Sequence, residues 1–129
     1  MELKVGSKAP DFTLADNQDG QVKLSDLKGK NVLLSWHPLA WTSVCTDQMR
    51  ALEAHKKDFD KLNTVALGLS VDPAPSKQVW ANVLSIKDTK LPSDFYPHGK
   101  VAQEYGIFLE DLGASGRVNI LVDEEGVIR

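Results

Sequence analysis

The feature that most constrains the fold of this chain is the alternation of apolar runs of strand length with a long segment of helical periodicity. The run at 32–36 reads Val-Leu-Leu-Ser-Trp and lacks strict alternation, which favours a strand covered on both faces. Apolar residues recur near helical spacing over 43–62, and a second β-rich run follows at 64–71. Strands that alternate with helices predict an α/β fold with a central sheet.

A β-hairpin is predicted to precede this core. Two short runs at 12–14 and 22–24 have the composition of strands, and the dipeptide Asp19-Gly20 lies between them. Asp-Gly between such runs is typical of a tight hairpin turn. We therefore expect the sheet to carry an N-terminal β-hairpin extension.

The second half of the chain is predicted to add two helices and a final hairpin. Ser76 can cap a helix, and the apolar face expected for that helix consists of Val79, Trp80, Val83 and Leu84. A shorter helix is expected to end near Gly106, since glycine suits a left-handed cap. A last strand over 117–122 turns through 124–126 into 127–128. This late hairpin predicts a mixed sheet rather than a purely parallel one.

Length and composition narrow the functional classes. At 129 residues, with 42% hydrophobic and 26% charged residues, the chain is expected to form one domain over 1–129 and not to be disordered. A net charge of −3 provides no basic surface for nucleic acid. With no apolar run of membrane-spanning length and no signal-peptide core, we expect a cytoplasmic protein without a membrane partner. Because the sequence stops inside a strand-like run, a C-terminal strand and helix are expected to be missing.

The single cysteine, Cys45, falls in the first turn of the predicted helix, directly after the buried strand. Unpaired backbone N–H groups and the positive end of the helix dipole favour an anion at that place. They therefore favour the thiolate, which is the nucleophilic form of cysteine. The alternative is that Cys45 is a small buried apolar side chain, as free cysteines commonly are.

Two neighbours of Cys45 suggest a shaped site. Thr42 lies three residues earlier, where its hydroxyl can reach the sulfur or a substrate oxygen, and Pro38 fixes the loop between strand and helix. Each also has an ordinary structural explanation. Thr42 or Ser43 can serve only as a helix cap, and Pro38 can serve only to end the strand.

Together these residues spell Pro38-x-x-x-Thr42-x-x-Cys45, which resembles the peroxidatic motif of the peroxiredoxins, in the alkyl hydroperoxide reductase and thiol-specific antioxidant group. Further matches follow in order along nearly the whole chain, at 9–14 (APDFTL), 24–30 (LSDLKGK), 44–46 (VCT), 105–108 (YGIF) and 122–128 (VDxxGxI). The resemblance implies a thioredoxin-like fold, a central mixed sheet flanked by helices. It also implies a thiol-dependent peroxidase that reduces hydrogen peroxide or organic hydroperoxides.

The resemblance assigns roles to five residues. Cys45 attacks the terminal peroxide oxygen and becomes a sulfenic acid, Thr42 hydrogen-bonds the peroxide, and Pro38 packs over the pocket. Arg117 stabilises the thiolate and the departing oxygen, because a fixed cation aimed at developing negative charge lowers the barrier. The alternative for Arg117 is a surface charge at the start of a strand. Gln48 is expected to support the arginine or the loop.

Other polar and aromatic residues near the motif are expected to be structural. His37 could act as a general base, but the preferred interpretation is that it is an ordinary loop histidine. Trp36 and Trp41 are expected to be packing residues, with Trp41 near the pocket mouth. Arg50 is expected on another face of the helix from Cys45.

Only one cysteine occurs in the chain, so a resolving partner is lacking within it. We expect a one-cysteine enzyme recycled by an external thiol or thioredoxin-like reductant; the alternative is that the missing C-terminal part holds the resolving cysteine. We expect homodimers because relatives often dimerise. No metal or other cofactor is expected, since three scattered histidines and no glycine-rich phosphate loop are present. A thiol-disulfide carrier is disfavoured because Gln48 stands where a C-x-x-C pair needs cysteine. A redox sensor or holdase without turnover, or a thioredoxin-like binding module, stays open as an alternative.

Overall fold

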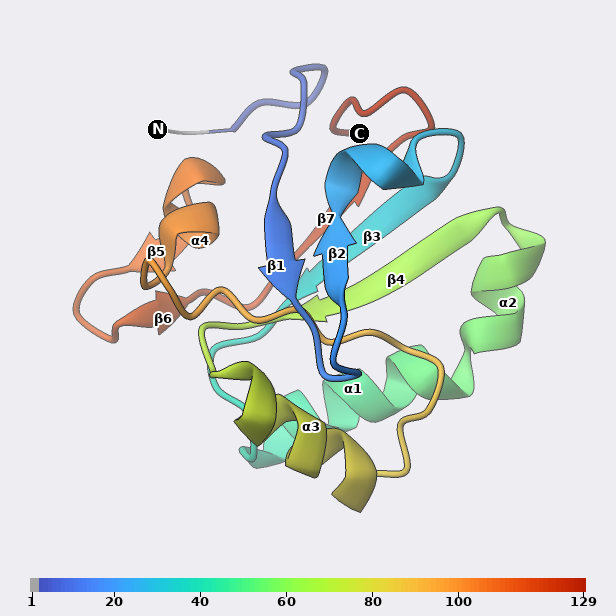
Figure 1. Ribbon diagram of the computed structural model, residues 1–129. Helices are drawn as coiled ribbons and strands as arrows, with labels where there is room; N and C mark the ends of the chain where they lie inside the picture. Colours follow the sequence, from blue (N-terminus) through green and yellow to red (C-terminus); the bar gives the residue numbers. More distant parts are fainter. Residues whose placement is uncertain (1–2) are drawn as a thin grey trace.

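The computed structural model describes residues 3–129 and is shown in Figure 1. In chain order, its elements are β1 (Thr13–Ala15), β2 (Gln21–Lys23), the 3-10 helix η1 (Leu24–Leu27), β3 (Asn31–Trp36), α1 (Ser43–Ala54), α2 (Lys56–Lys61), β4 (Thr64–Leu69), α3 (Ala74–Val83), α4 (Lys100–Glu104), β5 (Phe108–Leu109), β6 (Ala114–Ser115) and β7 (Val118–Val122). The predicted α/β class is confirmed.

The central sheet has the order β4-β3-β7, with β3 in the middle. β4 pairs with β3 in parallel, from Asn31 opposite Thr64 to Trp36 opposite Leu69, whereas β7 pairs with β3 antiparallel. The sheet is therefore mixed, as predicted. The predicted two-sided covering of β3 is also found, since Val32, Leu34 and Trp36 are buried in the larger core and Leu33 packs against the other cluster.

Each face of the sheet has its own layer. The N-terminal segment and α4 cover one face, and their apolar side chains join those of β3, β4 and β7 in the larger cluster. On the other face, α1 and α3 form a second cluster, which we call the thiol-side cluster; its buried members are Ala40, Cys45, Met49, Leu52, Trp80, Ala81, Ile86 and Leu91. In Figure 1 these two helices lie together below the sheet.

Both predicted hairpins are present, with small shifts in their bounds. β1 and β2 pair antiparallel, and Asp19 in the turn between them has a φ of 60°. After β7, the Asp123 N–H donates to the Val127 carbonyl at 2.8 Å, and Gly126 has a φ of 85°. Gly106 follows α4 with a φ of 69°, in the left-handed conformation expected there.

The prediction of one helix over 43–62 is wrong. His55, with φ −99° and ψ 14°, interrupts the helix and separates α1 from α2. α2 has no fully buried residue and packs on the second cluster of buried side chains through the half-buried Phe59. Val44 and Leu62, two of the apolar residues with helical spacing in this segment, are exposed by 57% and 68%.

The start and the buried face of α3 also differ from the prediction. The helix begins at Ala74 after Pro73, so Ser76 lies inside its first turn and is not the cap. Of the expected apolar face, Trp80 is buried, but Val79 and Val83 are exposed. Lys77 and Ala81 take inward positions, because Trp80 and Ala81 follow Lys77 by three and four residues and so lie beside it on one helical face.

Among residues 3–129, the structure contains no helix that is both long enough and apolar enough to cross a membrane.

Candidate active site

The candidate site lies where β3 ends and α1 begins. β3 occupies the middle of the sheet, and the chain then passes through a loop at 37–42 into α1, so that Cys45 is the third residue of that helix. The side chain of Cys45 is fully buried in the thiol-side cluster. Its position in the first turn of a twelve-residue helix favours negative charge on the sulfur.

Arg117 supplies a cation to this sulfur. It lies between β6 and β7, and its Nη2 is 3.4 Å from Cys45 Sγ. The rest of the arginine side chain reaches the surface. The fold therefore brings the guanidinium of Arg117 next to a sulfur that lies 72 positions earlier in the chain. Arg50 is exposed and lies apart from this contact, as expected.

Gln48 joins this arginine to the sheet. Its Oε1 accepts a hydrogen bond from Arg117 Nη1 at 2.5 Å, and its Nε2 donates to Ser35 Oγ at 2.7 Å and to the Trp36 carbonyl at 3.1 Å. The amide of Gln48 thus fixes the guanidinium relative to β3. Ser35 was not singled out from the sequence, because a serine within a strand gives no sign of its partner.

Thr42 and Pro38 lie in the loop that precedes Cys45. Thr42 is the N-cap residue of α1, but its hydroxyl donates to the Leu39 carbonyl at 2.9 Å rather than to the helix. The side chain is exposed, and the first-turn N–H groups are not capped by it. Pro38 is half-buried, two residues after the end of β3. Among the described residues, the side-chain hydrogen bond to Cys45 Sγ comes from Arg117 and not from Thr42.

The loop is held by residues that the sequence did not indicate. The Ala40 N–H donates to Asp72 Oδ2 at 2.8 Å, and Trp41, which has a φ of 73°, donates through Nε1 to Ser76 Oγ at 3.1 Å. In the sequence, Asp72 directly before Pro73 indicates only a turn, so its hydrogen bond to Ala40 could not be predicted. The loop is therefore fastened to the β4–α3 connection and to α3.

His37 is not the loop histidine that was expected. It is fully buried, its backbone N–H donates to the Leu69 carbonyl at 2.9 Å, and its ring packs on Trp80 with ring centroids 5.4 Å apart. Burial lowers the pKa of His37 well below its ordinary value, and the charge of Lys77 adds to this effect. The ring is therefore neutral at physiological pH.

The remaining aromatic side chains match their expected packing. Trp36 is fully buried in the larger core. Trp41 is 50% exposed and its ring centroid lies 6.5 Å from that of Trp80, so it lies at the edge of the site.

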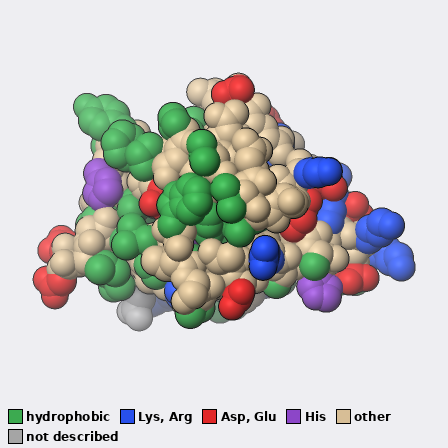
Figure 2. Space-filling model, turned by 90° about the horizontal axis from the view of Figure 1, so that it is seen from below, with side chains coloured by type: hydrophobic (Ala, Val, Ile, Leu, Met, Phe, Trp, Pro, Cys, Tyr) green, Lys and Arg blue, Asp and Glu red, His purple; other side chains and the backbone are tan. Residues whose placement is uncertain are grey.

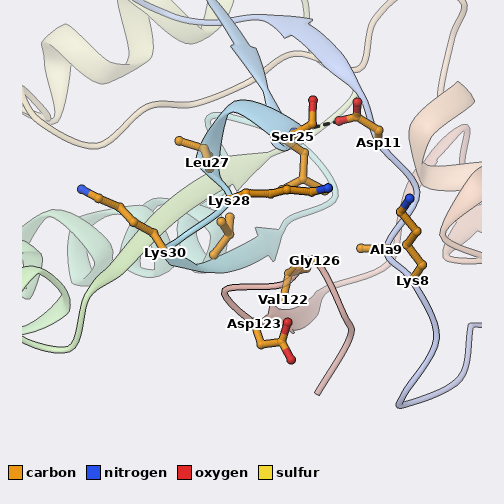
Figure 3. Close-up of a pocket in the computed structure, with 12 residues that line it drawn as sticks. Lys8, Ala9, Asp11, Ser25, Leu27, Lys28, Lys30, Val122, Asp123 and Gly126 are labelled. Carbon is orange, nitrogen blue, oxygen red and sulfur yellow. Dashed lines mark hydrogen bonds between the residues drawn. The ribbon is translucent and has the colours of Figure 1, made fainter.

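A separate hollow lies at the opposite end of the sheet and is shown in Figure 3. It is lined near the start of β3 and the end of β7 by Val32 and Val122, and charged residues of both signs, Lys8, Lys28, Asp11 and Asp123, also line it. Its charges are of both signs, and Cys45 is not among its lining residues. Within residues 3–129, no three His, Cys, Asp or Glu side chains gather in a way that could hold a metal ion.

Comparison with known proteins relates the sequence to a described family. The family model described as AhpC/TSA family matches residues 5–129. The chain is 42% identical over 128 residues to alkyl hydroperoxide reductase E of Mycobacterium tuberculosis, covering 98% of this chain and 83% of that protein. It is 35% identical over 135 residues to peroxiredoxin-2 of Mus musculus, covering 98% of this chain and 67% of that protein.

The fold has a close match among solved structures. The crystal structure of peroxidoxin BcpB from Mycobacterium tuberculosis superposes with a TM-score of 0.88 at 27% identity, covering 98% of this chain and 83% of that one. The predicted thioredoxin-like fold is confirmed by this match.

Proposed function

This chain belongs to the AhpC/TSA family, the peroxiredoxins, and is a thiol-dependent peroxidase; from that premise we propose that its chemistry takes place at Cys45 with the help of Arg117. The observation that carries the proposal is the 3.4 Å contact between Arg117 Nη2 and Cys45 Sγ. A guanidinium remains charged at any working pH and can stabilise both the thiolate and the oxygen that leaves.

In the proposed peroxidatic step, the Cys45 thiolate attacks the terminal oxygen of the peroxide, so that an S–O bond forms and the O–O bond breaks. The peroxide is reduced, the sulfur is oxidised to a sulfenic acid, and the departing oxygen takes up a proton to give an alcohol or water. Thr42 would donate its hydroxyl to the bound peroxide, and Pro38 would pack over it. The Thr42 hydroxyl would leave the Leu39 carbonyl to do so.

Burial of the sulfur implies a local movement. The Cys45 side chain has no exposed surface, whereas Thr42, Trp41 and Arg117 around it are exposed. The peroxide would therefore reach the sulfur when the loop at 38–42 or the Arg117 side chain shifts. Relatives named alkyl hydroperoxide reductases support organic hydroperoxides, besides hydrogen peroxide, as substrates.

An external thiol would complete the cycle, because the chain has one cysteine. One thiol would condense with the sulfenic acid, releasing water and forming a mixed disulfide, and a second would reduce that disulfide and restore Cys45. Members of this family act on peroxides with thiol reductants. A small thiol or a thioredoxin-like protein would serve as the reductant here.

We also propose that two copies pair through the face formed by α1, α3 and the loop between β3 and α1. Peroxiredoxins are commonly dimeric, and this face carries exposed apolar side chains, Leu39, Trp41, Val44, Val79 and Val83. Figure 2, which views the molecule from the side of α1 and α3, shows hydrophobic side chains gathered there. A group of exposed apolar side chains on one face is typical of an interaction surface.

Sustained turnover separates the proposed enzyme from a redox sensor. Peroxide consumption is followed with the protein at low concentration, excess hydrogen peroxide or cumene hydroperoxide, and excess dithiothreitol. The proposal predicts many equivalents consumed per protein and none above background in Cys45→Ser. Consumption of a single equivalent, followed by a stop in the presence of reductant, would favour the sensor.

A further inference from the structure

Lys77 is a charged side chain for which the proposed mechanism has no use. It lies on α3, has no exposed surface, and is one of the largest fully buried side chains of the chain. Lysine is almost never fully buried without compensation, because desolvation of an ammonium is costly. Its position therefore calls for a physical reason.

Two backbone carbonyls hold the Lys77 amine. Nζ donates to the Gly68 oxygen and to the Pro92 oxygen, at 2.9 Å each. An ammonium has three N–H donors, whereas a neutral amine has two and a lone pair. These two acceptors, the ones found for Nζ within residues 3–129, match both N–H donors of the neutral amine and leave the ammonium with one further donor. The site is therefore suited to both charge states.

The amine and the Cys45 sulfur border the same apolar cluster. A Cβ at Gly68 would meet the Met49 sulfur and a Leu91 methyl, so the Gly68 backbone lies directly against Met49. Met49 is one turn after Cys45 on the buried side of α1. One turn after Lys77, Trp80 enters the thiol-side cluster together with Cys45. Charges interact strongly across such a medium, because little water screens them.

Four titratable groups face Lys77 from different elements. Asp72 follows β4, Asp94 precedes α4, Cys45 lies on α1, and His37 directly follows β3. Burial lowers the pKa of Lys77 to about 7, while negative charge on Asp72, Cys45 and Asp94 opposes that shift. The charge of Lys77 therefore depends on whether the sulfur is an anion.

We propose that Lys77 is a positioning residue whose ammonium supports the Cys45 thiolate and which gives up its proton when that thiolate becomes a sulfenic acid. The inference rests on the proposed role of Cys45. Before the reaction, the thiolate and the ammonium balance each other. Thiolate, hydroperoxide and ammonium then yield sulfenic acid, alcohol and neutral amine, so the proton that the departing oxygen needs is matched by the one that Lys77 loses. The buried pair has zero net charge before and after oxidation.

Counting protons during oxidation tests this coupling. Reduced protein in weak buffer with a pH indicator is mixed with one equivalent of hydrogen peroxide. The pH is near or just below 7, and it is chosen so that the ultraviolet absorbance of the thiolate is present in the protein before mixing. In Lys77→Met, each sulfenic acid formed should take up close to one proton from solution. The wild type should take up clearly less, and its rate below neutral pH should exceed that of Lys77→Met by roughly three- to tenfold. Lys57→Met removes an exposed lysine of α2 and should match the wild type.

A second measurement needs no change at Lys77. The side-chain carbon resonance next to the Lys77 amine is titrated by NMR in the reduced wild type and in Cys45→Ser, which carries no thiolate. The titration midpoint should be lower in Cys45→Ser. Equal proton uptake in Lys77→Met and the wild type, or equal midpoints in the two titrations, would overturn the role of Lys77 while leaving the peroxidase intact. Failure of the wild type to form a sulfenic acid would instead overturn the proposed function.

Discussion

The guanidinium of Arg117 contacts two side chains, one through each of its terminal nitrogens. Nη2 faces Cys45 Sγ at 3.4 Å, and Nη1 is held by Gln48 at 2.5 Å. A cation that is already oriented requires little rearrangement when charge develops on the leaving oxygen. At the residue scale, the site thus consists of a sulfur, a cation and an amide that fixes the cation to Ser35.

Removal of the cation should slow oxidation without unfolding the chain. We expect Arg117→Ala to lower the second-order rate constant for hydrogen peroxide by roughly 100-fold, the size found when one charge-stabilising donor is removed. Arg50→Ala, which removes an exposed arginine of α1, is the matched control and should leave the rate constant unchanged. Both are measured by stopped-flow fluorescence. Equal rate constants for the two variants would remove Arg117 from the site.

Gln48 should act through the arginine. Gln48→Leu removes the acceptor for Arg117 and the donor to Ser35, and we expect a loss of roughly tenfold in the same rate constant, smaller than that of Arg117→Ala because the cation remains. Gln48→Glu keeps an acceptor for Arg117 and should retain more of the rate. If Gln48→Leu were as fast as the wild type, orientation of the guanidinium would not limit the reaction.

Sequence reasoning reached some of these residues and not others, for physical reasons. Cys45 stands out because a lone thiol falls at a predicted helix start, but only the family resemblance pointed to Arg117. Arg117 and Cys45 are 72 positions apart, and a contact over that separation produces no periodic pattern in the sequence. Lys77 was missed because a lysine at a helical position predicts a solvated side chain. Its burial depends on carbonyls of two other segments.

At the scale of elements, the close approach of α1 to the sheet depends on Gly68. This glycine lies opposite Ser35 in the parallel pair of β3 and β4, and both present little side-chain volume to α1. A Cβ at position 68 would overlap Met49, one turn from Cys45. The small residues in the sheet therefore set the depth at which the helix, and with it the thiol, can lie.

Gly68→Ala should move α1 outward. We expect a loss of about 1–3 kcal/mol in the free energy of unfolding, the usual cost of overpacking, measured by urea denaturation. Gly68→Ala should cost less in a Met49→Ala background than in the wild type, because the shorter side chain leaves room for the added methyl group. A single variant as stable as the wild type would mean that Met49 yields without cost.

Elements could be predicted where a pattern was local. The N-terminal hairpin followed from Asp19-Gly20, and β3 from its apolar run. The break at His55 and the rotation of α3 were not visible, because both depend on which side chains find buried partners. Val79 and Val83 fit a helical face by spacing, yet Lys77 and Ala81 occupy the buried side.

At the scale of the whole molecule, pairing of two copies through the face of α1 and α3 can be tested by charge. Val83 is 63% exposed on α3, and Val83→Glu places a carboxylate in the proposed interface. We expect sedimentation velocity to show a shift from dimer to monomer. Val5→Glu is the matched control, since Val5 is 74% exposed and lies in the N-terminal segment. Dimers that persist in Val83→Glu and dissociate in Val5→Glu would locate the interface elsewhere.

The central claim is that Cys45 is an activated thiolate, and its reaction with peroxide tests this most directly. Reduced protein is mixed with hydrogen peroxide in a stopped-flow instrument, and tryptophan fluorescence is followed, with Trp80 in the same cluster as the sulfur. The account predicts a fast change that scales with peroxide concentration, accompanies a mass gain of one oxygen, and is absent in Cys45→Ser. A rate no greater than that of a free thiol at the same pH would contradict it.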